Sequence, residues 1–191
     1  ALLIFFHCVA GRNVNRALAW VVAHRLREWH ENDAGSIVAN FDDHGFLFSL
    51  DARKDPPSAA WRSFFDPERL VDDLRRVLRQ TEQLGRRFRP IAETAQLLAR
   101  RNWQGLTAKR SASWNGSLLY ETLMKYEPDH PLLRETVREI LDQDLDAARA
   151  EREAARIHAV PWDAYTLPRP SPFALPLYTA FNRETLVAQD P

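Results

Sequence analysis

The sequence has 191 residues, of which 45% are hydrophobic and 27% are charged, and its 26 basic and 26 acidic side chains give a formal net charge of zero. This composition is typical of a soluble globular protein, and it excludes a chain drawn onto nucleic acid by its overall charge. No apolar run approaches the roughly 18 residues that a membrane-spanning helix needs, and the single Cys8 excludes an internal disulfide. The start of the chain does not have the pattern of a signal peptide, so we expect a cytoplasmic protein.

The first 55 residues are predicted to form a small α/β subdomain made of a strand, a helix and a β-hairpin. Residues 2–9 are a continuous apolar run, typical of a buried strand. Because the chain opens on this strand without an initiator Met, we expect it to be part of a longer protein. Residues 14–29 carry apolar side chains on one helical face, with Asn13 as the cap. Residues 37–41 and 46–50 flank a turn rich in Asp and Gly, which predicts the hairpin.

Residues 60–191 are predicted to form a second, mostly helical subdomain. Asp66 and Pro67 are typical of a helix start, and Gly85 is typical of the position after a helix end. Residues 102–112 lack a helical period and are predicted to be a loop. Further helices are expected from Pro90 to residue 98, from Ser113 to residue 126, from Pro131 to residue 145, and over residues 147–156.

The end of the chain is predicted to contain a short strand over residues 157–162 and then an irregular proline-rich tail. The tail is expected to dock onto the domain through apolar anchors at Phe173, Leu175, Leu177 and Phe181. The predicted fold class is therefore α+β: a small N-terminal sheet with a covering helix, then a mostly helical bundle and a docked tail.

The basic stretch around the predicted loop is the strongest candidate for a binding site. Between Arg75 and Arg110 there are ten basic residues and only two acidic ones. Cations neutralise phosphates, and an indole ring stacks on unpaired bases. The alternative is a solvated basic surface, and Trp114 is expected in the core. The candidate nucleic-acid-binding residues are Arg86, Arg87, Arg89, Arg100, Arg101, Trp103, Lys109 and Arg110.

Two acidic clusters were weighed as metal sites. The first resembles an EF-hand loop but has Ala147 where the loop requires Gly, so a capped helix at Asp144 or Asp146 is the preferred interpretation. The second falls in the predicted hairpin turn, where Asp and Gly serve the backbone. The clusters are Asp142, Asp144, Asp146 and Glu153, and Asp42, Asp43 and His44. No metal ion is expected in this chain.

Several segments resemble one known family. FRPIAE, SWNGSLLYE and KYEPDHPLLRETVREIL are similar to the carboxy-terminal part of the helicase core in Lhr-type large superfamily 2 helicases, a region called the DEAD/H-associated domain. The opening IFFHCVAGRNVNRALAWVVAHRL resembles the start of that domain, and LPRPSPFALPL resembles its end. The loop RNWQGLTAKRSASW departs from the family because it keeps the charge but has no proline.

The resemblance implies a parent protein that uses ATP and Mg to translocate on single-stranded DNA, unwinds duplexes and acts in DNA repair. It implies that ATP is bound upstream, on two RecA-like domains followed by a winged helix. This chain has neither a phosphate-binding loop nor an Asp-Glu-x-His box, so alone it is not expected to hydrolyse ATP. The implied role is accessory: closing the DNA channel, bracing the motor and contacting single-stranded DNA or RNA. The alternative is a structural or protein-interaction scaffold without nucleic-acid contact.

Overall fold

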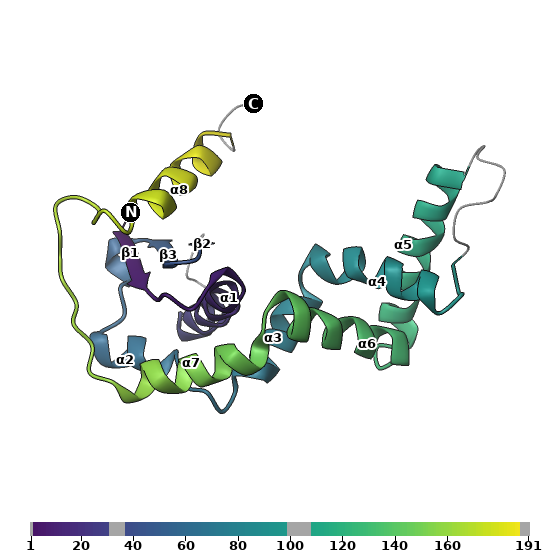
Figure 1. Ribbon diagram of the computed structural model, residues 1–191, viewed down its shortest axis with the longest axis horizontal. Helices are drawn as coiled ribbons and strands as arrows, with labels where there is room; N and C mark the ends of the chain where they lie inside the picture. Colours follow the sequence, from purple (N-terminus) through teal and green to yellow (C-terminus); the bar gives the residue numbers. More distant parts are fainter. Residues whose placement is uncertain (1, 31–36, 99–107, 188–191) are drawn as a thin grey trace. The chain divides into compact units, whose positions relative to one another are not determined.

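The computed structural model describes residues 2–30, 37–98 and 108–187 (Figure 1), with the backbone alone at Val38, residues 108–115 and residues 183–187. A three-stranded antiparallel sheet has the order β1-β3-β2. Its strands are β1 (Leu2–His7), β2 (Val38–Phe41) and β3 (Gly45–Leu50). The register pairs His7 with Gly45 and Leu2 with Leu50. The predicted strand and hairpin are confirmed.

Helix α1 (Arg12–Trp29) packs against β2 and β3, as its apolar face predicted. The predicted cap at Asn13 is wrong, because the helix already begins at Arg12, after Gly11 in the left-handed region at φ 88°. The buried Asn15 holds the start of the helix in place. Its Nδ2 donates at 2.8 Å to the carbonyl oxygens of both Cys8 and Asp42, so one side chain ties the β1–α1 turn to the hairpin turn.

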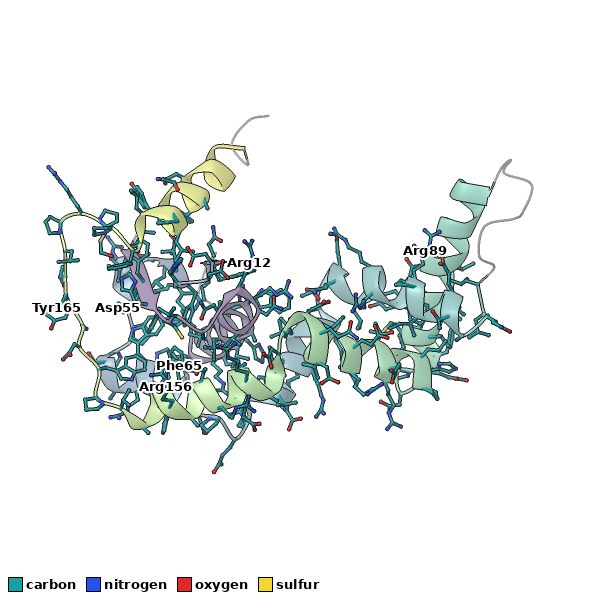
Figure 2. All side chains as sticks on the ribbon, viewed as in Figure 1. Arg12, Asp55, Phe65, Arg89, Arg156 and Tyr165 are labelled. Carbon is teal, nitrogen blue, oxygen red and sulfur yellow. The ribbon has the colours of Figure 1, made fainter. Side chains whose placement is uncertain are left out.

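An aromatic cluster forms the core on one face of the sheet. The single turn η1 (Ala52–Lys54) and the short helix α2 (Ser58–Ser63) follow β3. They bring Trp61 of α2 and Phe65 of the following turn against aromatic side chains of β1 and β3. Phe65 is labelled in Figure 2. Stacked and edge-to-face rings like these dominate the energetics of small cores. The cluster consists of Phe6, Phe46, Phe48, Trp61, Phe65 and Trp162.

Two predicted helix boundaries are wrong. Helix α3 (Leu70–Arg79) ends before Gly85, and α4 (Glu82–Thr94) contains both Gly85 and Pro90. The two helix breakers are tolerated because α4 buries a continuous face that includes Leu84 and Phe88, and packing overrides intrinsic propensity. A Cβ at Gly85 would lie 3.5 Å from the Tyr120 ring of α5, an ordinary van der Waals contact, so the space beside α5 does not require glycine there.

The helices that follow pack on α4. Helix α5 (Ala108–Tyr126) begins five residues before the predicted cap at Ser113, so the loop predicted to extend to residue 112 is already helical at 108. The predicted helix from Pro131 is confirmed as α6 (Pro131–Glu139), which continues into the π-helical turn η2 (Ile140–Asp144). A core of Phe88, Ala92 and Leu133 joins α4 to α6, and α5 covers it.

The end of the chain differs most from the prediction. The strand predicted at 157–162 is wrong, because helix α7 (Ala147–Ala159) covers its first three residues and no strand follows among the described residues. A further helix, α8 (Leu175–Val187), lies where only an irregular tail was expected. The prolines after residue 160 suggested irregular structure, but Pro176 falls in the first turn of α8, where a missing N–H costs nothing. Of the predicted anchors, Leu177 is buried, Phe181 is half-buried, and Phe173 and Leu175 are exposed.

Contacts divide the chain into two compact units. Residues 1–74 and 145–191 form the first, and residues 75–144 form the second. The first unit contains the sheet, α1, α2, α7 and α8, and the second contains α4 to α6. The sequence predicts subdomains of residues 1–55 and 60–191, and these units have other bounds. The difference arises because α7 returns to pack on α1 and α2. Among the described residues, no helix is long and apolar enough to cross a membrane.

Candidate nucleic-acid interface

The predicted site residues fall into three groups. Arg86, Arg87 and Arg89 lie on α4. Lys109 and Arg110 lie in the first turn of α5, where only the backbone is described. Arg100, Arg101 and Trp103 lie outside the described residues, so their role stays a prediction. The five described residues belong to one unit, because α4 and α5 pack on each other.

Arg89 lies where α4 crosses α5. Its Nε donates to Oε1 of Glu93 at 3.0 Å, one helical turn away. A Cβ on Gly116 of α5 would lie 3.7 Å from Cγ of Arg89, so the aliphatic part of Arg89 packs beneath α5. The Arg89 guanidinium is half-exposed beside this crossing of the two helices.

Arg86 is the most exposed of the three arginines, with 81% of its side chain accessible. Its partner is Glu82 at 2.8 Å, one turn earlier on the same helix and equally exposed. Such i,i+4 pairs on a surface are worth only about 0.3–0.5 kcal/mol. Arg86 can therefore exchange Glu82 for a phosphate group at little cost.

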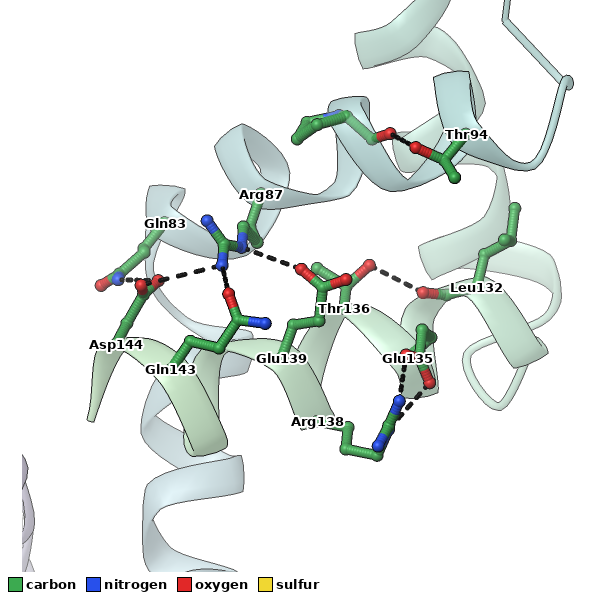
Figure 3. A network of polar contacts seen from close by, with 11 residues as sticks. Gln83, Arg87, Thr94, Leu132, Glu135, Thr136, Arg138, Glu139, Gln143 and Asp144 are labelled. Carbon is green, nitrogen blue, oxygen red and sulfur yellow. Dashed lines mark hydrogen bonds and ion pairs between the residues drawn. The ribbon is translucent and has the colours of Figure 1, made fainter. Parts of the chain in front are cut away.

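Arg87 is held by the protein itself. Figure 3 shows its guanidinium between α4 and the end of α6, where Nε lies 3.2 Å from Oε2 of Glu139 and Nη2 donates to Oε1 of Gln143. Oδ1 of Asp144 lies 3.9 Å from Nη2 of Arg87, and Oδ2 of Asp144 accepts a hydrogen bond from Nε2 of Gln83. Only 29% of the Arg87 side chain is accessible. The network joins α4 to η2, so Arg87 supports the fold of this unit.

Separate substitutions of Arg87 and Arg86 distinguish the structural role of Arg87 from the surface position of Arg86. We expect Arg87→Ala to lower the free energy of unfolding by about 1–2 kcal/mol, because it leaves Glu139 and Asp144 without their cation. Arg86→Ala serves as the control and should change stability by less than about 0.5 kcal/mol. Urea unfolding followed by far-ultraviolet circular dichroism measures both. Equal stability of the two variants would show that the network around Arg87 contributes nothing.

Side chains of both acidic clusters take part in local backbone structure. Asp146 adopts the left-handed region at φ 45° and its side chain accepts from the N–H of Arg149, which confirms the predicted cap of α7. In the hairpin turn, Oδ1 of Asp42 accepts from the backbone N–H groups of His44 and Gly45 at 2.8 and 3.0 Å. No group of three potential metal ligands occurs among the residues that the structure describes.

Cys8 has no catalytic setting. It is buried directly after β1, and this burial raises the pKa of its thiol. A raised pKa keeps the thiol protonated, and the thiolate is the reactive form. The interpretation of Cys8 as a small core residue agrees with this environment.

One basic and aromatic arrangement was missed by the sequence analysis. The guanidinium carbon of Arg12 lies 5.7 Å from the Phe41 ring centroid, and that of Arg16 lies 5.6 Å from the Trp20 ring centroid. Arg12, Arg16 and Trp20 follow each other at four-residue intervals on α1. That spacing is visible in the sequence and would have predicted the cation–π pair of Arg16 and Trp20.

Comparison with known proteins gives a consistent set of relatives. The family model described as DEAD/H associated matches residues 2–174. The ATP-dependent helicase Lhr-Core protein 2 of Thermococcus barophilus is 32% identical over 97% of this chain and 21% of its own length. The Lhr helicase/uracil glycosylase of Escherichia coli is 30% identical over 98% of this chain and 12% of its own length.

A solved structure shares the fold. The helicase Lhr of Mycobacterium smegmatis, bound to ssDNA and AMP-PNP, is similar with a TM-score of 0.70 and 25% identity, over 92% of this chain and 22% of that chain. This chain thus spans about a fifth of the length of the helicase Lhr-Core protein 2 and of that solved helicase. The resemblance that the sequence suggested is confirmed.

Proposed function

The chain belongs to the DEAD/H associated family, and from this premise we propose that it is an accessory domain of an Lhr-type ATP-dependent DNA helicase. In this proposal it braces the motor and contacts single-stranded nucleic acid in a cytoplasmic protein that acts in DNA repair. The observation that carries the proposal is the similarity of nearly the whole chain to a helicase determined with ssDNA bound. The matched region is about a fifth of the Thermococcus barophilus helicase, and in this proposal the motor activity resides in further domains of a longer polypeptide.

ATP and Mg enter this proposal only through the rest of the polypeptide. The sequence of this chain has no phosphate-binding loop, and Mg in such motors is held beside the bound nucleotide. RecA-like and winged-helix domains of the same polypeptide are the expected partners. Purified parent protein should therefore turn over ATP, and this chain alone should not.

The proposed DNA contact centres on the segment that links α4 to α5. Arg86 contributes an accessible cation and Arg89 a half-exposed one, while Arg87 is engaged in the network with Glu139. Arg100, Arg101, Trp103, Lys109 and Arg110 supply the remaining cations and a stacking ring. Because Arg86 and Arg89 also pair with acids of the same helix, their exposure agrees with both the proposed contact and the scaffold alternative, and the two functions need a direct test.

A salt titration of fluorescent oligonucleotide binding by the parent helicase distinguishes them. If about three phosphates are neutralised, the logarithm of the binding constant should fall with the logarithm of the salt concentration with a slope of about −2. Trp103→Ala should cost roughly 1–3 kcal/mol and leave the slope almost unchanged, because stacking releases few counterions. Arg100→Ala or Lys109→Ala should reduce the slope by about 0.7, the share of one contact. Unchanged affinity and slope in all three variants would favour the scaffold function.

A further inference from the structure

A stretch near the end of the chain is held at both ends. Residues 163–170, called the strap below, follow Trp162, whose ring lies 5.8 Å from the Phe6 ring and 5.2 Å from the Phe65 ring. The Trp162 Nε1 also donates to the carbonyl oxygen of Ile157 at 2.8 Å. After the strap, Oγ of Ser171 lies 3.3 Å from Nε2 of His7, and Ala174 is buried. Both anchors are thus in contact with β1 and its core.

Between these anchors the strap touches little of its own unit. All eight of its residues are exposed and none belongs to a helix or strand. Tyr165 is 78% exposed and Leu167 is 58% exposed, and Figure 2 shows Tyr165 pointing away from the rest of the unit. The strap makes no hydrogen bond to any other residue that the structure describes. Phe173, inside the second anchor, and Leu175, just after it, are also exposed. Exposed apolar side chains on a segment with so few contacts of its own favour an interaction site.

The composition of the strap suits recognition as an extended segment. Leu167 and Arg169 each precede a proline, which favours an extended backbone at both positions. In an extended backbone, residues two apart point to the same side, so Tyr165, Leu167 and Arg169 can face one partner together. Fixed ends and two prolines reduce the conformational entropy lost on docking. The surface that fits the strap has two apolar pockets and a carboxylate.

The comparisons show that the relatives of this chain are much longer helicase polypeptides. The family model extends to residue 174, so the strap is part of the domain that recurs in these helicases. In the Thermococcus barophilus relative the matched region is only 21% of the protein, and most of the polypeptide lies outside it. We propose that the strap docks into an apolar groove on the remaining, motor-bearing part of the same helicase polypeptide. This inference rests on the proposed function, because it takes the chain to be one domain of such a helicase.

Hydrogen exchange on the complete helicase polypeptide tests the docking. In the unsubstituted protein, the backbone amides of residues 163–167 and of Arg169 should exchange at least about tenfold more slowly than in an unstructured peptide. A double variant with Tyr165→Ser and Leu167→Ser should lose this protection, since both pocket-filling side chains are gone. Leu118→Ser is the matched control, because it removes an exposed leucine from the other unit and should leave the protection intact.

The opposite outcomes are equally clear. Unprotected amides in the unsubstituted polypeptide, protection that survives the double substitution, or loss of protection in the Leu118→Ser control would each overturn the docking. A separate assay of ATP turnover and unwinding by the same preparations distinguishes this from the proposed function. A polypeptide that unwinds DNA with an unprotected strap contradicts the docking alone, whereas one that turns over no ATP contradicts the proposed helicase function.

Discussion

Gly45→Ala should lower the free energy of unfolding by about 3 kcal/mol or more, a cost at the upper end of what overpacking produces. Gly45 opens β3 opposite His7. A Cβ at this position would lie 2.1 Å from the carbonyl oxygen of Phe6 and 3.1 Å from its carbonyl carbon. These are backbone atoms of the adjacent strand, so only a shift of β1 against β3 can make room.

Gly85→Ala is the matched control for this substitution. Gly85 lies inside α4, and an added Cβ would meet the Tyr120 ring at 3.5 Å, an ordinary van der Waals distance. Because glycine within a helix is destabilising relative to alanine, we expect a gain of about 0.5–1 kcal/mol. Urea unfolding followed by tryptophan fluorescence measures Gly45→Ala, since Trp61 and Trp162 lie in the cluster around Phe6. Far-ultraviolet circular dichroism measures Gly85→Ala, since Gly85 lies in the helical second unit. An unchanged midpoint for Gly45→Ala would contradict the close strand contact.

The small sheet could be predicted from the sequence because its signals are local. A continuous apolar run, two short β-rich segments and a turn between them determine β1, β2 and β3. The role of Gly45 was less accessible. The local pattern explains this glycine by the conformation of the turn, whereas the structure shows that the neighbouring strand excludes a side chain there. That requirement arises from pairing with a strand some forty residues earlier, which local patterns do not contain.

The error at α4 explains why the candidate site was only partly predicted. Taking Gly85 as a helix end and Pro90 as a helix start divided one helix into two. In the continuous helix, Leu84, Phe88 and Ile91 form the buried face, and Arg87 lies in phase with them at i+3 from Leu84. Arg87 would then have been expected to need a partner within the protein, and Arg86 to face solvent. The bounds of α4 therefore determine which arginines face solvent, and the number of charges in the stretch does not.

A second inward-facing charge was visible in the sequence but was not used. Arg25 lies among the apolar positions of α1, three residues after Val22 and four before Trp29. Asp73 lies in the same way on α3, three residues after Leu70. A single charge on an apolar helical face requires a buried partner of opposite sign. Two such charges on two helices predict an ion pair between them, although the sequence alone cannot give its geometry.

The structure contains that pair. Nε of Arg25 donates to Oδ2 of Asp73 at 2.7 Å, and the side chains are 8% and 0% exposed. Nη1 of Arg25 also donates to the carbonyl oxygens of Phe64 and Asp66 at 2.8 and 2.7 Å. Arg25 thus joins α1 to the segment between α2 and α3. Such a pair is costly to bury. Removing Asp73 leaves the buried Arg25 without its carboxylate, whereas removing Arg25 leaves the buried Asp73 with the exposed Arg69, whose Nη2 lies 3.6 Å from Oδ1 of Asp73.

Asp73→Ala should therefore lower the free energy of unfolding by about 3–5 kcal/mol, and Arg25→Ala by a similar amount. The double variant should cost less than the sum of the two, with a coupling of about 2 kcal/mol, because no buried charge remains. The same cycle on the exposed pair Arg86 and Glu82 is the control, with an expected coupling of about 0.3–0.5 kcal/mol. Urea unfolding of all variants gives both couplings. Additive effects of Asp73→Ala and Arg25→Ala would show that the two charges do not stabilise one another, and that Arg25 acts through the carbonyl groups of Phe64 and Asp66 alone.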